Sequence, residues 1–160
     1  MRVLLVSNPS SGSSKKKTLD EITVLLGRLG DVRRVQPSSL DSFDETLTSA
    51  AEDSSLVVTA GGDGTMNRTV NALAHRLQDL SFALVPMGTG NDLARTLGIP
   101  TDPSDAAHAI VEGTERSIDV SAASSADAER LFVNACMGGF PVDVDEAMDP
   151  DLKRRLGPIA

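Results

Sequence analysis

Three short, mainly apolar runs constrain the fold of this 160-residue chain more than any other feature of its sequence. They occupy residues 3–6, 56–60 and 82–86, and each is followed by a turn rich in Gly, Ser or Asn. A short apolar run bounded by turn signals is typical of a strand that is covered on both faces in a parallel sheet. A further short strand is expected at 32–35.

Segments with helical spacing of apolar residues separate these strands. The expected helices cover residues 19–29, 42–53, 66–77, 91–97 and 103–111. Helix starts are indicated by three capping patterns, which are Thr18 with Glu21, Ser42 with Glu45, and Asp102 before Pro103. The alternation of strand and helix over residues 1–113 predicts an α/β domain with an open, mostly parallel sheet and helices on both faces.

The pattern changes after Gly113. Residues 116–122 and 130–137 are predicted to form two antiparallel strands, so that 114–160 is the beginning of a second, β-rich domain that stops early. Its apolar residues are expected to lack most of their packing partners; they are Ile118, Val120, Leu131, Phe132, Val133 and Met137. We therefore expect the chain either to form a homodimer through this region or to leave it disordered.

Composition excludes several classes of function. The net charge of −8 and the four aromatic residues, all Phe, argue against a nucleic-acid partner, which requires basic surface and stacking platforms. The single cysteine, Cys136, rules out a disulfide framework. No apolar stretch is long enough for a membrane span, and the N-terminus lacks a signal-peptide core, so a cytoplasmic location is predicted.

Candidate chemistry lies where the strands end. The turns at 8–12, 61–65 and 88–92 are expected at one edge of the sheet, where ligands of open α/β folds bind. Their glycines, and the hydroxyls of Ser11, Thr65 and Thr89, suit a polyphosphate. Asp63 and Asp92 would repel phosphate unless Mg²⁺ lies between them, which predicts a metal–nucleotide ligand. The alternative is that these are tight turns in which Asp and Asn only cap helices.

The turns match neither the P-loop nor the dinucleotide-binding fingerprint, which disfavours P-loop NTPases and Rossmann dehydrogenases. The sequence resembles the diacylglycerol kinase catalytic-domain family instead. The resemblance is carried by GGDGTMN at 61–67, VNAL at 70–73, PMGTGNDLAR at 86–95 and NPSSG at 8–12, together with Asp119 and residues 134–140. Similar first turns occur in NAD kinases and phosphofructokinases, but the NDLAR end of the second motif distinguishes this family from them.

The resemblance implies phosphoryl transfer from ATP to the hydroxyl of diacylglycerol or a similar lipid alcohol, at the inner surface of a membrane. It places ATP at Asn8, Pro9, Ser10, Ser11, Gly12, Gly61, Gly62, Asp63, Gly64, Thr65, Met66, Asn67, Gly88, Thr89, Gly90 and Asn91. It assigns Asp63, Asp92 and Asp119 to a catalytic acidic network that holds Mg²⁺ through water. Arg68 departs from the pattern because it stands where the family usually has Glu, and no residue matches the family's general base.

Two other functions remain open from the sequence. One is a nucleotide-binding or regulatory module without kinase activity of its own, because no candidate for the general base is found. The other is an NAD kinase-like enzyme.

Overall fold

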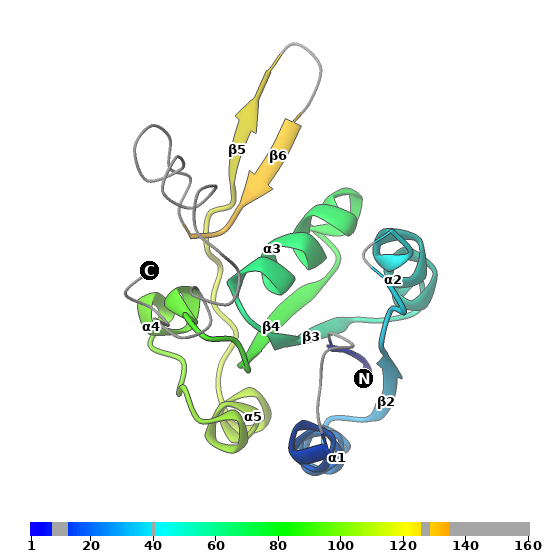
Figure 1. Cartoon of the computed structure of the whole chain (residues 1–160), viewed down its shortest axis with the longest axis vertical. Helices are drawn as coiled ribbons and strands as arrows, with labels where there is room; N and C mark the ends of the chain where they lie inside the picture. Colours follow the sequence, from blue (N-terminus) through cyan, green and yellow to red (C-terminus); the bar gives the residue numbers. More distant parts are fainter. Residues whose placement is uncertain (8–12, 40, 126–128, 135–160) are drawn as a thin grey trace.

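The computed structural model describes residues 1–7, 13–39, 41–125 and 129–134. The order of elements along the chain is β1 (Arg2–Ser7), α1 (Ser13–Leu26), β2 (Asp31–Val35), α2 (Phe43–Ala51), β3 (Leu56–Gly61), α3 (Asp63–Ala72), the 3₁₀ turn η1 (Ala74–Arg76), β4 (Ser81–Pro86), α4 (Asp92–Leu97), α5 (Pro103–Glu112), β5 (Ser121–Ser124) and β6 (Glu129–Phe132). Figure 1 shows a layered α/β body from which the ribbon of β5 and β6 projects.

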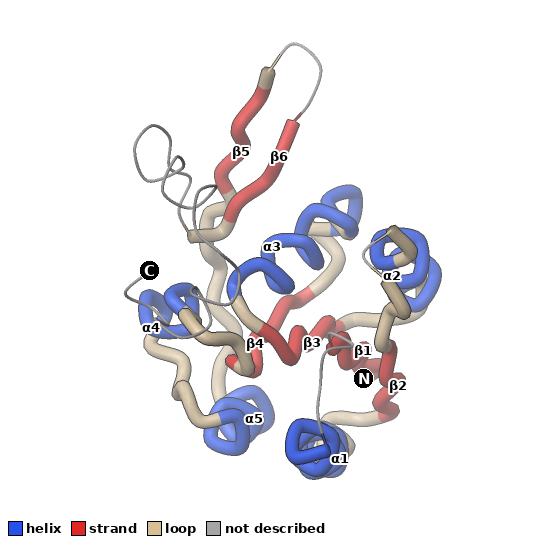
Figure 2. Tube along the Cα trace, in the orientation of Figure 1, coloured by secondary structure: helices blue, strands red, loops and turns tan. Residues whose placement is uncertain are grey.

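The main sheet has four parallel strands in the order β2-β1-β3-β4. Parallel neighbours need crossover connections, and helices supply them between successive strands. Helices lie on both sides of this sheet, with α1 and α5 on one side and α2 and α3 on the other (Figure 2). The predicted fold class is confirmed.

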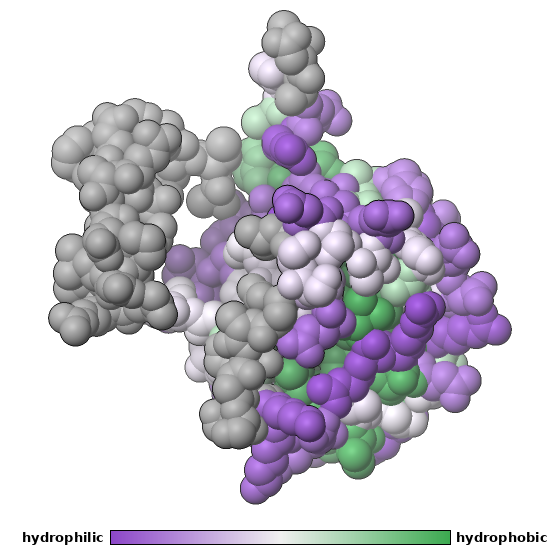
Figure 3. Space-filling view, turned by 45° about the vertical axis from the view of Figure 1, so that its right-hand side comes forward, coloured by the Kyte–Doolittle hydropathy of each residue, from purple (hydrophilic) through white to green (hydrophobic). Residues whose placement is uncertain are grey.

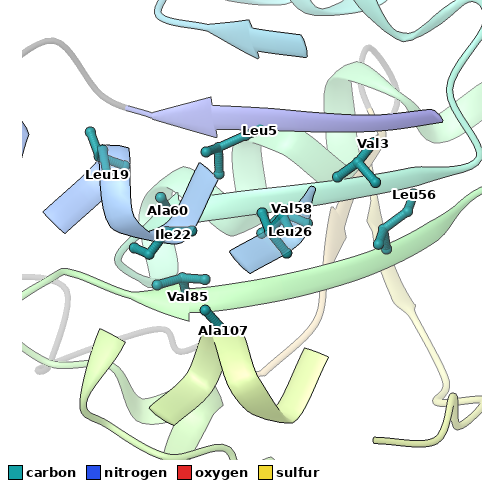
Figure 4. Close-up of a cluster of buried hydrophobic side chains, with 10 residues drawn as sticks. All are labelled: Val3, Leu5, Leu19, Ile22, Leu26, Leu56, Val58, Ala60, Val85 and Ala107. Carbon is teal, nitrogen blue, oxygen red and sulfur yellow. The ribbon is translucent and has the colours of Figure 1, made fainter. Parts of the chain in front are cut away.

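The core is divided by the sheet because successive strand residues point to opposite faces. Val3, Leu5 and Val58 face α1 and α5, where they meet Ile22 and Ala107 (Figure 4). The alternate residues, Leu4, Val6 and Val57, pack against α2 on the opposite face. All six strand residues are buried, which explains why β1 and β3 read as continuous apolar runs.

Several helix boundaries differ from the sequence predictions. Helix α1 begins at Ser13 and ends at Leu26, so Thr18 lies inside it and the capping box with Glu21 is wrong as a start signal. Ser42 is the N-cap of α2 but makes no capping bond, because its hydroxyl contacts Ser38 and Ser39 instead. Helix α3 begins earlier than expected, at Asp63, and a 3₁₀ turn replaces its end.

The predicted cap of α5 is correct. Asp102 accepts hydrogen bonds from the amides of Ser104 and Asp105 at 2.8 and 3.1 Å, and Pro103 occupies the first turn. This is the arrangement expected of an Asp-Pro pair at a helix start.

The predicted hairpin after Gly113 forms, but it is shorter than expected. Residues 114–120 have no regular secondary structure, and β5 pairs with β6 in antiparallel register from Ser121 opposite Phe132 to Ser124 opposite Glu129. Val120, Leu131 and Val133 are partly buried against a cluster centred on α3, whereas Ile118 is 49% exposed. Part of the ribbon therefore has packing partners within the chain. Residues 135–160, with Met137 and Cys136, lie outside the described residues, and self-association remains a prediction.

Candidate functional site

The carboxyl ends of the central strands lie level with one another. Ser7 at the end of β1 is opposite Ala60, and Gly61 at the end of β3 is opposite Pro86 at the end of β4. The turns that follow these strands therefore start from one edge of the sheet, as the sequence predicted. The first turn, with Asn8, Pro9, Ser10, Ser11 and Gly12, lies outside the described residues.

The two glycine turns after β3 and β4 touch each other through their backbones. The amide of Met87 donates to the carbonyl of Gly61 at 2.9 Å. A Cβ atom on Gly88 would lie 2.5 Å from the Cα of Gly62, and one on Gly62 would lie 3.1 Å from the Cα of Gly88. Gly88 therefore needs glycine for a packing reason, because a side chain there would force the turns apart, and Gly62 leaves little room for one.

Asn91 holds the second turn closed. Its backbone is in the left-handed region, with φ of 56°, which Asn tolerates better than most residues. Its side chain accepts a hydrogen bond from the amide of Gly88 at 3.0 Å and donates to the carbonyl of the same residue at 2.9 Å. The side chain thus stabilises the turn and makes no capping bond to α4.

Asp63 supplies the cap that Asn91 does not. Its two carboxylate oxygens accept hydrogen bonds from the amides of Asp92 at 3.0 Å and Leu93 at 2.8 Å, which open α4. The negative charge also lies at the positive end of that helix. Asp63 is half-buried and joins the two turns. Its role in a metal network remains a prediction.

Asp92, the first residue of α4, provides a second carboxylate next to the glycine turns. One oxygen of Asp92 pairs with Arg95 at 2.7 Å. A Cβ atom on Gly90 would lie 3.4 Å from an oxygen of Asp63 and 3.6 Å from one of Asp92, so both carboxylates border the same glycine.

Asp119 is exposed, in the stretch between α5 and β5. Within the described part of the chain, no group of three acidic, His or Cys side chains is placed to ligate a metal directly. A direct three-carboxylate metal site is thus not formed, and the predicted role through water is untested.

The other predicted nucleotide-binding residues differ in what they present. Gly64 is exposed with open space where a side chain would be, and Thr89 is exposed. Thr65 folds over Gly61, whose added Cβ would lie 2.9 Å from the Thr65 hydroxyl. Met66 is 6% exposed and packs in the core, and its amide donates to the carbonyl of Gly62 at 3.1 Å, so this residue presents little to a ligand. The Oδ1 atom of Asn67 is buried without a hydrogen-bond partner.

Two α3 residues have contacts that sequence reasoning missed. Arg68 pairs with Asp44 at 3.0 Å and lies over the ring of Phe43, 5.0 Å from its centroid, so it joins α3 to α2. Asn71 bonds to the backbone of β6. No local signal in the sequence marks Asn71, because its partner Leu131 lies 60 residues away.

An open parallel α/β sheet, with two touching glycine turns at its carboxyl edge and a helix starting from each, defines the class of open α/β domains, in which such turns can present backbone amides to a phosphate group. Comparison with known proteins identifies the family within this class. The model of the diacylglycerol kinase catalytic domain matches residues 2–123, and the chain belongs to that family.

Individual relatives agree with this assignment. The chain is 32% identical to a diacylglycerol kinase of Staphylococcus saprophyticus over 99% of its own length and 52% of that protein. It is 38% identical to a Pseudomonas aeruginosa protein named "Probable lipid kinase YegS-like", over 82% of the chain and 38% of that protein. The crystal structure of a diacylglycerol kinase from Bacillus anthracis superposes with a TM-score of 0.66 at 30% identity, covering 74% of this chain and 42% of that one.

The chain spans about half the length of the curated relatives that it matches. The match to the Staphylococcus saprophyticus protein covers 99% of this chain but 52% of that protein. Among the described residues, no helix combines the length and the hydrophobicity that crossing a bilayer requires.

Proposed function

We propose that this chain provides the nucleotide-binding part of an ATP-dependent lipid kinase whose acceptor is the hydroxyl of diacylglycerol or a similar lipid alcohol at a membrane surface. The observation that carries the proposal is the backbone contact between Gly62 and Gly88, which brings two glycine turns together at the carboxyl edge of the sheet. The names of the relatives support the choice of a lipid as acceptor.

The turn 61–65 is the proposed binding site of the ATP phosphates. Helix α3 begins at Asp63, and the amides of Thr65 and Met66 already donate to the carbonyl of Gly62. The amides of Asp63 and Gly64 have no acceptor within the helix. These amides, the positive end of the helix dipole and the open space at Gly64 together suit a phosphate oxygen. Binding of this kind positions the transferred phosphoryl group, which is most of what such catalysis requires.

Mg²⁺ fits this site as an ion held through water. The two carboxylate oxygens of Asp63 accept hydrogen bonds from backbone amides, but each oxygen has a second lone pair that a water molecule can use. The carboxylate of Asp92 lies near Gly90, as that of Asp63 does. Bound there, Mg²⁺ would neutralise charge on the phosphates. The carboxylates of Asp63 and Asp92 would orient its waters, and Asp119 stays a third proposed member of this network.

A thermal-shift titration with Mg-ATP tests the binding site. The chain is expected to gain several degrees in Tm at saturating Mg-ATP, because a ligand stabilises the state that binds it. Gly64→Leu should fold with a Tm close to that of the parent, since a side chain has room there, but should lose most of the Mg-ATP shift. Gly64→Ala is the matched control, because a methyl group at this position obstructs the turn less than a Leu side chain does. An unchanged shift in Gly64→Leu would contradict phosphate binding at this turn.

Transfer of labelled phosphate tests the reaction. The chain, and a longer chain from the same gene, would be supplied with Mg-ATP and either diacylglycerol vesicles or NAD. Label in the lipid is expected, and label in NAD at a comparable rate would favour an NAD kinase-like enzyme. Mg-ATP binding without transfer by either chain would favour a binding module.

A further inference from the structure

Asn71 of helix α3 makes two hydrogen bonds to the β5–β6 ribbon. The Nδ2 atom of Asn71 donates to the carbonyl of Leu131 at 2.8 Å, and its Oδ1 atom accepts from the amide of Leu131 at 3.0 Å. The same Nδ2 group also donates to the carbonyl of Asn67, one turn earlier on α3. The amide plane of Asn71 is therefore fixed from both sides.

This paired contact copies the way a neighbouring strand would bind. In an antiparallel ladder a residue directs both its amide and its carbonyl either to the partner strand or away from it. Leu131 is opposite Ala122 in the ribbon, and both of its backbone groups bond to Asn71. Asn71 thus occupies the outer edge of β6 as a third strand would, 60 residues away in sequence.

Apolar packing supports the contact without replacing it. Leu131, Val133 and Val120 are partly buried against the cluster of Met66 and Val70. Figure 3 shows green, apolar atoms near the base of the ribbon, with purple, hydrophilic atoms beside them. Every residue of β5 is exposed, so the described ribbon contacts the body chiefly through β6.

The helix that carries Asn71 also starts at the candidate phosphate turn. Asp63 is its first residue, and Asn71 lies eight positions further along the helix, which corresponds to about 12 Å of axis length. Because a helix of this kind is rigid and α3 is also packed against the sheet, the ribbon is tied to the position of the turn 61–65.

We propose that Asn71 is a positioning residue, which locks the ribbon to α3 so that the chain following β6 leaves at a set place relative to the phosphate turn. The proposal rests on the proposed function only for the identity of the ligand at that turn. This role requires a side-chain amide that both donates a hydrogen bond and accepts one. Neither a carboxylate nor an apolar side chain of the same size satisfies this requirement.

Hydrogen exchange on the 160-residue chain tests the lock without any ligand. In Asn71→Leu the amide of Leu131 should exchange at least about tenfold faster, because two hydrogen bonds are lost, while the amides of Leu5 and Val58 in the central sheet should change little. Asn71→Asp keeps an acceptor for the Leu131 amide but loses the donor, so an intermediate loss of protection is expected. Arg68→Ala, which removes a contact of α3 on its α2 side, is the matched control and should leave Leu131 protected.

Unchanged exchange at Leu131 in Asn71→Leu would overturn the proposal. If that variant does not fold, Asn71→Asp decides by the same comparison, and uniform loss of protection in the sheet and the ribbon would show a merely structural role and also overturn it.

A kinase assay adds a second readout, in which Asn71→Leu should lower kcat at least about tenfold with the KM for ATP within about twofold of the parent. A raised KM with kcat unchanged would contradict positioning. Absence of Mg-ATP binding in the parent chain would instead count against the proposed function, and the lock would still be judged from the Leu131 amide.

Discussion

The four-stranded sheet and the two-stranded ribbon are held in place in different ways. Residues 3–7 of β1 and all residues of β3 are buried, because helices cover both faces of the sheet. In the ribbon, β5 is exposed throughout and β6 is at most half-buried. The sheet therefore owes its position to many small apolar contacts, whereas the ribbon depends on fewer contacts, most of them with α3.

This difference matters for the candidate site because α3 belongs to both regions. Its buried residues pack on the sheet, its N-terminus forms part of the proposed phosphate-binding turn 61–65, and Asn71 bonds to the ribbon. A change in the sheet should be felt by the whole body, while a change in the ribbon should stay local. Variants of the sheet, of the helix caps and of the protein surface can test this contrast between the sheet and the ribbon.

The largest effect is expected from truncating a side chain in the sheet. Leu4→Ala should lower the free energy of unfolding by about 2–5 kcal/mol, because Leu4 is fully buried and leaves a cavity between β1 and α2. Leu131→Ala in the ribbon is the matched change at a partly buried site, and it should cost only about 1 kcal/mol. Urea unfolding followed by circular dichroism measures both. Equal losses would show that the ribbon and the sheet form one cooperative core.

An intermediate effect is expected from removing helix caps. Asp63→Ala and Asp102→Ala each delete a carboxylate that accepts two amides, so each should cost about 1 kcal/mol of stability. Only Asp63→Ala should also abolish stabilisation by Mg-ATP, because Asp102 caps α5 outside the glycine turns. Thermal unfolding with and without Mg-ATP separates the two effects. A retained Mg-ATP shift in Asp63→Ala would leave this residue as a cap alone.

The smallest effect is expected at the surface between α2 and α3. Arg68→Ala should cost about 0.5–1 kcal/mol, because it removes an ion pair with Asp44 and the contact with the Phe43 ring. Arg28→Ala deletes a more exposed ion pair, with Glu112, and should cost less. Chemical denaturation of both variants in low and high salt gives the comparison. A loss that disappears in high salt for Arg68→Ala would show that the ring contributes nothing.

Much of the candidate site could be predicted because it depends on local sequence. Gly and Asn at strand ends indicate tight turns by their backbone preferences alone, and parallel strands bring their carboxyl ends to one edge. The Asp102-Pro103 start of α5 is likewise a local pattern. Ser42 shows the limit of such reasoning, because its hydroxyl finds partners in Ser38 and Ser39 and the capping bond is not made.

The sequence by itself determined the parallel sheet, the helices on both faces and the glycine turns, because hydrophobic periodicity and turn chemistry act over a few neighbouring residues. The tertiary structure alone decided which groups meet across long separations. Asp63 caps a helix that begins 29 residues later, and Asn71 binds a strand residue 60 positions away. No local pattern encodes these partners, since hydrogen bonds of this kind form only after packing has brought the donor and the acceptor within about 3 Å.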